Sequence, residues 1–334
     1  MPEAATPIEE VAGIDPAALP EALLRRDQPC VLRGLTTHWP SSRAGAASAS
    51  EAIAYLQRFA SAAPAMVTLA PPECGGRIFY RDDMLGLGFR HERASLAALL
   101  DRLQRPGDGT TLYMGSVAVD ACLPGFRADN DLGFGELQPL ASAWVGNRTR
   151  IPTHQDLPDN IACVVAGHRR VTLFPPQQLP NLYVGPLELT PAGQPVSLVD
   201  PASPDLARFP RYAEAMCHAR VAELAPGDAV LIPSMWWHHM EALDDFNVLV
   251  NYWWRQSPAW MDTPMNALMA AILSVRDLPP AQREIWRGVF DHYVFDAGAD
   301  TAAHIPEAAR GMLGDIDQRL ARELRARLLQ RLNR

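Results

Sequence analysis

The sequence lacks several features that would assign it to a specialised class of protein. Its five cysteines are scattered and never form a CxxC pair, so neither a disulfide framework nor a zinc knuckle is indicated. No run of about 18 apolar residues could span a bilayer, and the acidic start Met1–Ala4 is unlike a secretory signal, so we expect a cytoplasmic protein. Neither a nucleotide-binding glycine motif, a P-loop nor a GxSxG hydrolase motif occurs.

The charge and composition are those of an ordinary globular protein. Hydrophobic residues make up 48% and charged residues 20% of the 334 residues, which is enough for a sizeable core. The formal net charge is −8. This charge weighs against nucleic acid as a partner, although a local basic groove could still bind it.

Periodicity divides the chain into three parts. Residues 1–109 mix short helical and strand patterns, and we expect them to pack on the core. Residues 110–257 contain short apolar strands punctuated by turns, which indicates a barrel or double-sheet jelly roll. Residues 258–334 are helical, and an apolar stripe from Ile316 to Leu328 must pack on the core or on a second subunit. We therefore expect a mainly β protein with flanking helices, whose helical C-terminal segment contributes to a homodimer.

One connection between strands has the pattern of a β-hairpin. Residues 160–167 form an apolar run, Gly167 and His168 offer a two-residue turn, and residues 169–174 follow as a second strand. We therefore expect these two strands to pair with each other. Residues 177–212 are rich in proline and leucine, and we expect an ordered excursion there rather than a linker.

The strand that ends at Asp156 carries the residues with the clearest chemistry. Residues i and i+2 of a strand project from the same face, so His154 and Asp156 can present an imidazole and a carboxylate to one point. Two histidines and one carboxylate are the ligand set of non-haem Fe(II) oxygenases. The third ligand would come from a strand 84 residues downstream, where only one of the adjacent His238 and His239 can point inward. A cupin that binds zinc or manganese for non-oxidative chemistry is an alternative.

Four blocks in order resemble the cupin-like JmjC family of Fe(II)- and 2-oxoglutarate-dependent oxygenases, which includes the asparaginyl hydroxylase acting on hypoxia-inducible factor. The blocks are Thr153–Asp156, Gly167–Pro176, Pro226–Pro233 and Trp236–Trp253. With a matching N-terminal signature, the resemblance covers residues 29–255. It implies a double-stranded β-helix, or jelly roll, and the hydroxylation of a protein or peptide side chain with release of succinate and CO2.

The resemblance also implies roles for single residues. By position, His154, Asp156 and His238 would bind iron, and His239 would lie outside the ligand set. Arg169 stands where the family usually has the lysine that binds the distal carboxylate of 2-oxoglutarate. A guanidinium can pair bidentately with a carboxylate, yet it is not interchangeable with an ammonium group. Three further residues fall where the hydroxylase contacts its cosubstrate: Tyr113, Asn160 and Asn251.

Two residues depart from the family pattern. Ile151 stands where the hydroxylase has a threonine, and Gln155 stands where relatives commonly have an aromatic residue. Together with Arg169, these departures keep open a metal-binding module without oxygenase activity. An RNA-base hydroxylase of the same family is the other alternative. An apolar wall that keeps water from the site, or ordinary barrel core, is the interpretation for three residues: Trp144, Val164 and Trp253.

Overall fold

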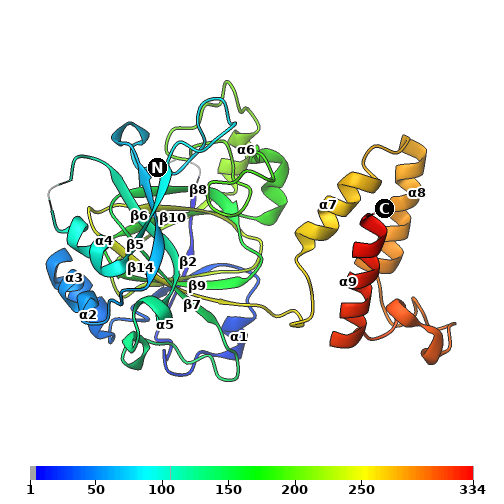
Figure 1. Ribbon diagram of the computed structural model, residues 1–334, viewed down its shortest axis with the longest axis horizontal. Helices are drawn as coiled ribbons and strands as arrows, with labels where there is room; N and C mark the ends of the chain where they lie inside the picture. The colour runs from blue at the N-terminus through cyan, green and yellow to red at the C-terminus, as the bar shows by residue number, and fades with distance from the viewer. Residues whose placement is uncertain (1–4, 106, 334) are drawn as a thin grey trace. The chain divides into compact units, whose positions relative to one another are not determined.

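The computed structural model describes residues 5–105 and 107–333. The expectation that the chain has no secretory signal rests on Met1–Ala4, which lie outside the described residues. Within the described residues the strands form two mixed sheets that face each other (Figure 1). The five-stranded sheet has the order β1 (Thr6–Pro7), β11 (Arg220–Leu224), β10 (Arg169–Phe174), β13 (Trp237–Ala242), β8 (Thr149–Gln155). The nine-stranded sheet has the order β2 (Glu9–Ala12), β3 (Cys30–Arg33), β12 (Ala229–Ile232), β9 (Asp159–Ala166), β14 (Asn247–Trp254), β7 (Leu140–Gly146), β6 (Thr111–Ala118), β4 (Pro64–Ala70), β5 (Arg90–Ser95).

The strands from β7 to β14 make a jelly roll. Their order gives two opposed faces, β8-β13-β10-β11 and β7-β14-β9-β12, and most successive strands lie in opposite sheets. Apolar side chains from both faces, among them Val164, Val171 and Leu249, fill the space between the sheets. This packing removes from water the apolar side chains on the inner faces of the strands from β7 to β14. The expected mainly β fold of the jelly-roll type is confirmed.

The expected hairpin between β9 and β10 is wrong. β9 pairs with β12 and β14, whereas β10 pairs with β11 and β13, so the two strands lie in different sheets. Gly167 has a φ of +71° and turns the chain from one sheet to the other. A Cβ at this position would lie 2.5 Å from the Phe246 carbonyl oxygen. The turn docks on the β13–β14 connection, because the Leu243 N–H donates to the His168 carbonyl at 2.9 Å.

Helices and additional strands extend the jelly roll on the N-terminal side. The helices of this part are α1 (Glu21–Leu24), α2 (Pro40–Ala47), α3 (Ala49–Gln57), α4 (Leu96–Leu103), α5 (Val119–Cys122), and α6 (Tyr212–Cys217) follows later in the chain. α2 lies so close to β9 that a Cβ at Gly45 would come within 1.8 Å of the Val165 carbonyl oxygen. The Ser48 hydroxyl caps α3 by accepting from the Glu51 N–H. The sequence patterns did not predict β4 and β5, although β4 carries Thr68 toward the site described below.

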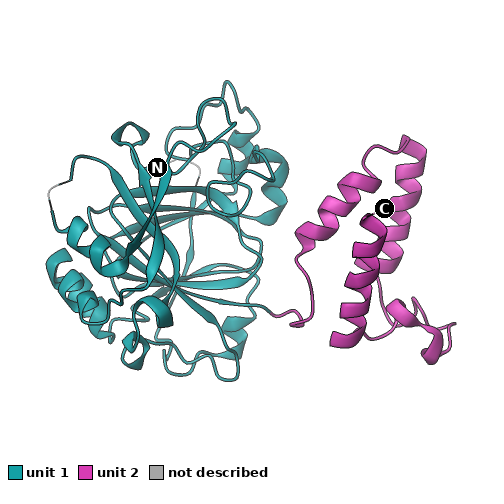
Figure 2. Cartoon of the chain, viewed as in Figure 1, with its two compact units in different colours: residues 1–255 teal, residues 256–334 magenta. Residues whose placement is uncertain are grey.

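The chain divides into two compact units, residues 1–255 and 256–334 (Figure 2). The second unit contains α7 (Pro264–Ser274), α8 (Pro280–Phe290) and α9 (Gln318–Leu332). Its described residues bury only Ala302 and Ala321. Large apolar side chains are exposed on all three helices: Leu268, Met269, Leu273, Ile285, Trp286, Val289, Leu328, Leu329 and Leu332. The helical C-terminal segment is therefore confirmed, whereas the three-part division of the chain stays a prediction. In the described part of the chain, no helix combines the length and the apolar character needed to span a membrane.

Candidate metal centre

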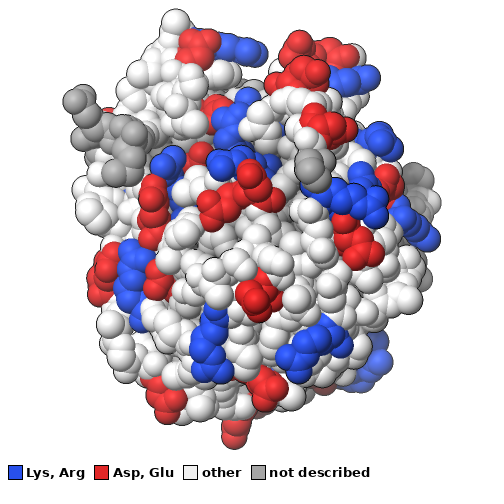
Figure 3. Space-filling view, turned by 90° about the vertical axis from the view of Figure 1, so that its left-hand side faces the viewer, with Lys and Arg blue, Asp and Glu red and all other residues white. Residues whose placement is uncertain are grey.

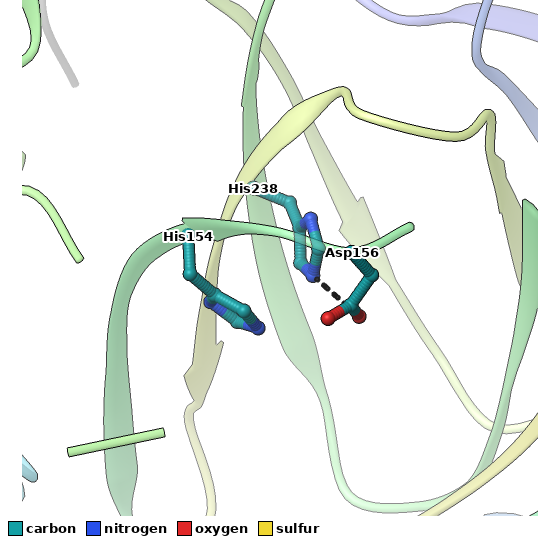
Figure 4. A group of neighbouring side chains, drawn as sticks. All are labelled: His154, Asp156 and His238. Atoms are coloured by element: carbon teal, nitrogen blue, oxygen red, sulfur yellow. Dashed lines mark ion pairs between the residues drawn. The ribbon is translucent and has the colours of Figure 1, made fainter. Parts of the chain in front are cut away.

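Three side chains from two segments of the chain converge between the sheets. His154 lies on β8, Asp156 follows that strand directly, and His238 lies at the start of β13, which pairs with β8 (Figure 4). One ligand atom from each residue lies within 4.8 Å of the others. His238 Nε2 is 3.6 Å from Asp156 Oδ2, and the two imidazole centroids are 4.2 Å apart. Two imidazoles and a carboxylate at this spacing are a donor set that fits a divalent transition metal.

Backbone carbonyls fix the orientation of both imidazoles. The Nδ1 of His154 lies 2.8 Å from the Pro152 carbonyl oxygen, and the Nδ1 of His238 lies 3.0 Å from that of Trp236. A carbonyl can only accept, so each Nδ1 carries the proton. Each Nε2 therefore keeps its lone pair and faces the shared point, which is the arrangement that metal-binding histidines use.

Burial and mutual charge set the protonation states of the cluster. Burial, together with the neighbouring His238, lowers the pKa of His154 to about 4, so this imidazole is neutral at pH 7. Burial alone would raise the pKa of Asp156. The neighbouring imidazoles of His238, whose Nε2 lies 3.6 Å from the carboxylate, and of His154 outweigh burial and bring the pKa of Asp156 to about 2. At neutral pH the site thus offers the neutral imidazole of His154 and an ionised carboxylate.

His239 lies on the opposite face of β13 from the cluster. It pairs across the sheet with Thr172 of β10, and it is 2% exposed. Neither of its ring nitrogens has a hydrogen-bond partner among the described residues, and burial lowers its pKa to about 3. The alternation of side chains along a strand thus separates the two adjacent histidines. His238 joins the cluster, and His239 packs behind it.

A cavity of about 90 Å3 adjoins the three side chains. All the residues that the sequence linked to a cosubstrate line it: Tyr113, Asn160, Arg169 and Asn251. Arg169 is only 2% exposed, and its guanidinium forms no ion pair or hydrogen bond with the described residues. The Nε atom of this group is buried without a partner. Burial lowers the pKa of Arg169 to about 10, which still leaves it charged at pH 7. A buried cation facing a cavity without a counter-ion is a site for an anion.

Further polar atoms in the cavity wall also lack partners. The indole Nε1 atoms of Trp144 and Trp253 and the Oδ1 of Asn251 are buried without a hydrogen-bond partner in the described part of the chain. The Nδ2 of Asn251 donates to Asn160 Oδ1 at 3.0 Å, which fixes the amide. The ring of Tyr113 stacks on Trp144 at 6.0 Å, and burial raises the pKa of its hydroxyl, which remains a donor at neutral pH. Several hydrogen-bond donors thus surround the space beside Arg169.

Sequence patterns missed part of this wall and misjudged another part. Trp144 and Trp253 line the cavity, and each has a buried indole N–H without a partner among the described residues. Val164, which was expected in the same wall, packs in the core and does not line the cavity. Ile151 lines the cavity as well, because a register shift between β8 and β13 turns both Ile151 and His154 inward. Four more lining residues had no sequence signal: Thr68, Ile78, Pro191 and Ala192. Gln155, by contrast, pairs with Trp237 and does not line the cavity.

Comparison with known proteins identifies the fold. The profile of the cupin-like domain matches residues 16–259, which is most of the chain. The chain belongs to the cupin-like domain family. The resemblance expected from the four sequence blocks is thereby confirmed at the level of the family, and the converging residues lie inside the matched cupin-like region.

Several curated proteins are similar to this cupin-like chain. Lysine-specific demethylase JMJ31 of Arabidopsis thaliana is 34% identical over 115 residues, which is 34% of this chain and 20% of the relative. The tRNA wybutosine-synthesizing protein 5 of Danio rerio is 36% identical over 107 residues, covering 32% and 30%. The human bifunctional peptidase and (3S)-lysyl hydroxylase JMJD7 is 25% identical over 262 residues, covering 68% and 77%. The chain thus spans only a fifth to a third of the length of the first two relatives.

Proposed function

We propose that this chain is an Fe(II)- and 2-oxoglutarate-dependent oxygenase that hydroxylates a side chain of a protein or peptide. The observation that carries the proposal is the presence, in one cavity, of a His-Asp-His cluster and a buried guanidinium without a counter-ion. A keto diacid is complementary to both, because one end can chelate a metal while the distal carboxylate pairs with Arg169.

The residues of the chain would each perform a simple task. His154, Asp156 and His238 would hold the metal and leave open positions for other ligands. The guanidinium of Arg169 would bind the distal carboxylate and fix the direction of the chelating end. When bound, iron and the keto acid would supply the oxidation, in which 2-oxoglutarate and O2 give succinate and CO2 and one oxygen atom of the O2 is inserted into a C–H bond of the substrate. The walls around the cavity would exclude bulk water from the reacting atoms.

A protein or peptide substrate agrees with the names of two relatives. JMJD7 is named a lysyl hydroxylase, and JMJ31 is named a lysine-specific demethylase. Hydroxylation of a side chain that reaches into the mouth of the cavity is the activity that we propose here.

An anaerobic titration with Fe(II) and then 2-oxoglutarate tests the proposal. A keto acid chelated to Fe(II) gives a visible charge-transfer band, and we expect it for the wild type but not for His154→Ala or His238→Ala. His239→Ala is the matched control, because this neighbour of His238 is buried on the opposite face of β13, and it should keep the band. Tight iron binding without a band would favour a metal-binding module without oxygenase activity. Binding of zinc or manganese without any binding of 2-oxoglutarate would favour a non-oxidative cupin.

The RNA-base hydroxylase is supported by one relative, whose name is tRNA wybutosine-synthesizing protein 5. Two observations argue against it here. The net charge is −8, and acidic and basic side chains are interspersed on the face of the molecule seen in Figure 3, without a broad basic groove there. Succinate release stimulated by tRNA and not by peptide libraries would overturn our preference for a protein substrate.

We also propose that residues 256–334 associate with a second copy of the chain. If the exposed apolar side chains on α7, α8 and α9 were covered, each chain would bury on the order of 1,000 Å2, comparable with the roughly 800 Å2 per partner of a standard interface. Light scattering should give a mass twice the 36.6 kDa of one chain. Trp286→Asp should lower this mass, and Arg287→Ala on the same helix should not. A monomeric wild type would refute the proposal.

A further inference from the structure

A loop beside the metal-binding strand closes one side of the cavity. The segment that carries it is joined to β8, because the Ser197 N–H donates to the Thr153 carbonyl at 2.7 Å and Val196 forms a bridge with His154. At the base of the loop, the Gly185 N–H donates to the Val196 carbonyl at 2.9 Å. The loop 186–195 thus begins and ends close to a residue of the proposed metal site.

The loop itself is held by one hydrogen bond and by the packing of Ala192 on the apolar core. Among the described residues, no backbone hydrogen bond joins any residue of 186–195 to another part of the chain. Its prolines, Pro186, Pro191 and Pro195, have no N–H to donate. The one hydrogen bond in this stretch comes from the Tyr80 hydroxyl, which donates to the Leu189 carbonyl at 2.7 Å. Tyr80 is 6% exposed, and burial raises its pKa, so the hydroxyl stays protonated.

This loop is the wall of the cavity that can move with the least loss of structure. Pro191 and Ala192 face the cavity, and apart from Ile78 the other lining residues lie on strands or directly beside one. Moving a strand would break a ladder of hydrogen bonds, whereas moving the loop breaks the one bond from Tyr80 and the packing of Ala192 on the apolar core. At about 90 Å3 the cavity is smaller than the roughly 300–1,000 Å3 of typical ligand pockets, so one of its walls must move to make room for a keto acid.

We propose that residues 186–195 form a gate over the metal centre and that Tyr80 is the positioning residue that holds the gate closed through Leu189. This inference rests on the proposed function, because it assumes that a keto acid passes the gate. Loss of the Tyr80 hydroxyl should make opening more frequent without removing any group that touches the keto acid. Association and dissociation of the keto acid should then accelerate by the same factor, and its affinity should stay the same.

Tyr80→Phe tests the gate, because it removes the hydroxyl and keeps the buried ring. The readout is amide exchange of Gly185 and Ser197, whose hydrogen-bonded N–H groups flank the loop. Loss of one hydrogen bond corresponds to roughly a three- to tenfold change, so their exchange should accelerate by about that factor in the metal-free protein. Stopped-flow mixing of the Fe(II) protein with 2-oxoglutarate under argon should give both rate constants raised by a similar factor. Tyr183→Phe is the matched control, since its hydroxyl accepts from the Arg211 N–H at 2.9 Å, away from the loop, and it should change neither measurement.

The possible outcomes separate the two proposals. Unchanged exchange in Tyr80→Phe would show that the hydroxyl does not hold the loop. Faster exchange with unchanged rate constants would show that the loop moves but is not a gate. A lower affinity for 2-oxoglutarate with an unchanged association rate would assign Tyr80 a purely structural role. If the wild type binds iron but forms no keto-acid band, both the proposed function and the gating of 2-oxoglutarate are wrong. The exchange measurement still decides in that case whether Tyr80 holds the loop.

Discussion

Replacing Arg169 by methionine should stabilise the ligand-free protein and abolish its response to 2-oxoglutarate. Methionine has a similar length and no charge, so it can fill the same space between the sheets. In the described part of the chain, the guanidinium has neither a carboxylate partner nor a hydrogen bond to offset the loss of its hydration. The fold therefore carries a buried charge at a cost in stability, and we attribute its presence to ligand binding.

The size of this cost follows from the pKa of Arg169. Burial lowers this pKa from 12.5 to about 10, which corresponds to roughly 3 kcal/mol against the charged form. Replacing buried charges by apolar groups of similar volume is commonly neutral or stabilising by about 1–4 kcal/mol, which agrees with this value. For a domain of this size, about 2 kcal/mol of net gain would raise the melting temperature by roughly 5 °C.

Thermal unfolding with and without ligand measures both effects. In the presence of Mn(II), 2-oxoglutarate at a hundred times its Kd should stabilise the wild type by about 2.7 kcal/mol. Arg169→Met should melt at a higher temperature without ligand and show no shift when 2-oxoglutarate is added. Arg170→Met is the matched control, because this neighbour pairs with Glu223 at 2.7 Å near the surface and should keep the ligand response. An Arg169→Met protein that is less stable than the wild type, or that 2-oxoglutarate still stabilises, would refute the reasoning.

Two further predictions concern single polar groups. Trp144→Phe removes an unpartnered indole N–H from the cavity wall, so the Kd of 2-oxoglutarate should rise by roughly three- to tenfold while Mn(II) binding, measured by calorimetry, stays unchanged. Burial raises the pKa of Glu241 above its ordinary 4.5, so the folded state favours the protonated form and loses stability as pH rises through the folded pKa. Glu241→Gln should therefore raise the melting temperature at pH 7, and the gain should shrink toward pH 4.5. An equal gain at both pH values would contradict this explanation.

Local patterns were sufficient to predict individual elements and most of the site. The strand Arg169–Phe174 has the bounds that its local pattern indicated. His154 and Asp156 share a face because side chains alternate along an extended strand, and that rule is local. The choice between His238 and His239 needed the pairing of β13 with β8, which periodicity does not contain.

Long-range pairing explains what the sequence did not predict. The Gly167 turn fits a hairpin locally, yet the chain there passes from one sheet to the other and docks on the β13–β14 connection. β5 is charged and largely exposed, so it lacks the apolar alternation by which strands are recognised. Tyr80 and the loop 186–195 have no motif, and their relation depends on one hydrogen bond between segments 109 residues apart.

Arg169 is best understood together with Ile151 and with the composition of the chain. All 30 basic residues are arginine and no lysine occurs, so an arginine at position 169 is not by itself a sign of lost function. Ile151 lines the same cavity and cannot donate a hydrogen bond, and the guanidinium offers more donors than an ammonium group. We therefore expect the two positions to be coupled.

A double-mutant cycle measures this coupling. Arg169→Lys should weaken 2-oxoglutarate binding by about tenfold or more, because one charge-assisted hydrogen bond is lost. Ile151→Thr alone should have little effect, since the arginine already satisfies the carboxylate. The double variant has the lysine and the threonine of the asparaginyl hydroxylase, and it should recover most of the lost affinity, which calorimetry in the presence of Mn(II) would detect. If the effects of the two substitutions simply add, the guanidinium does not substitute for the missing hydroxyl, and Ile151 marks a real weakening of the cosubstrate site.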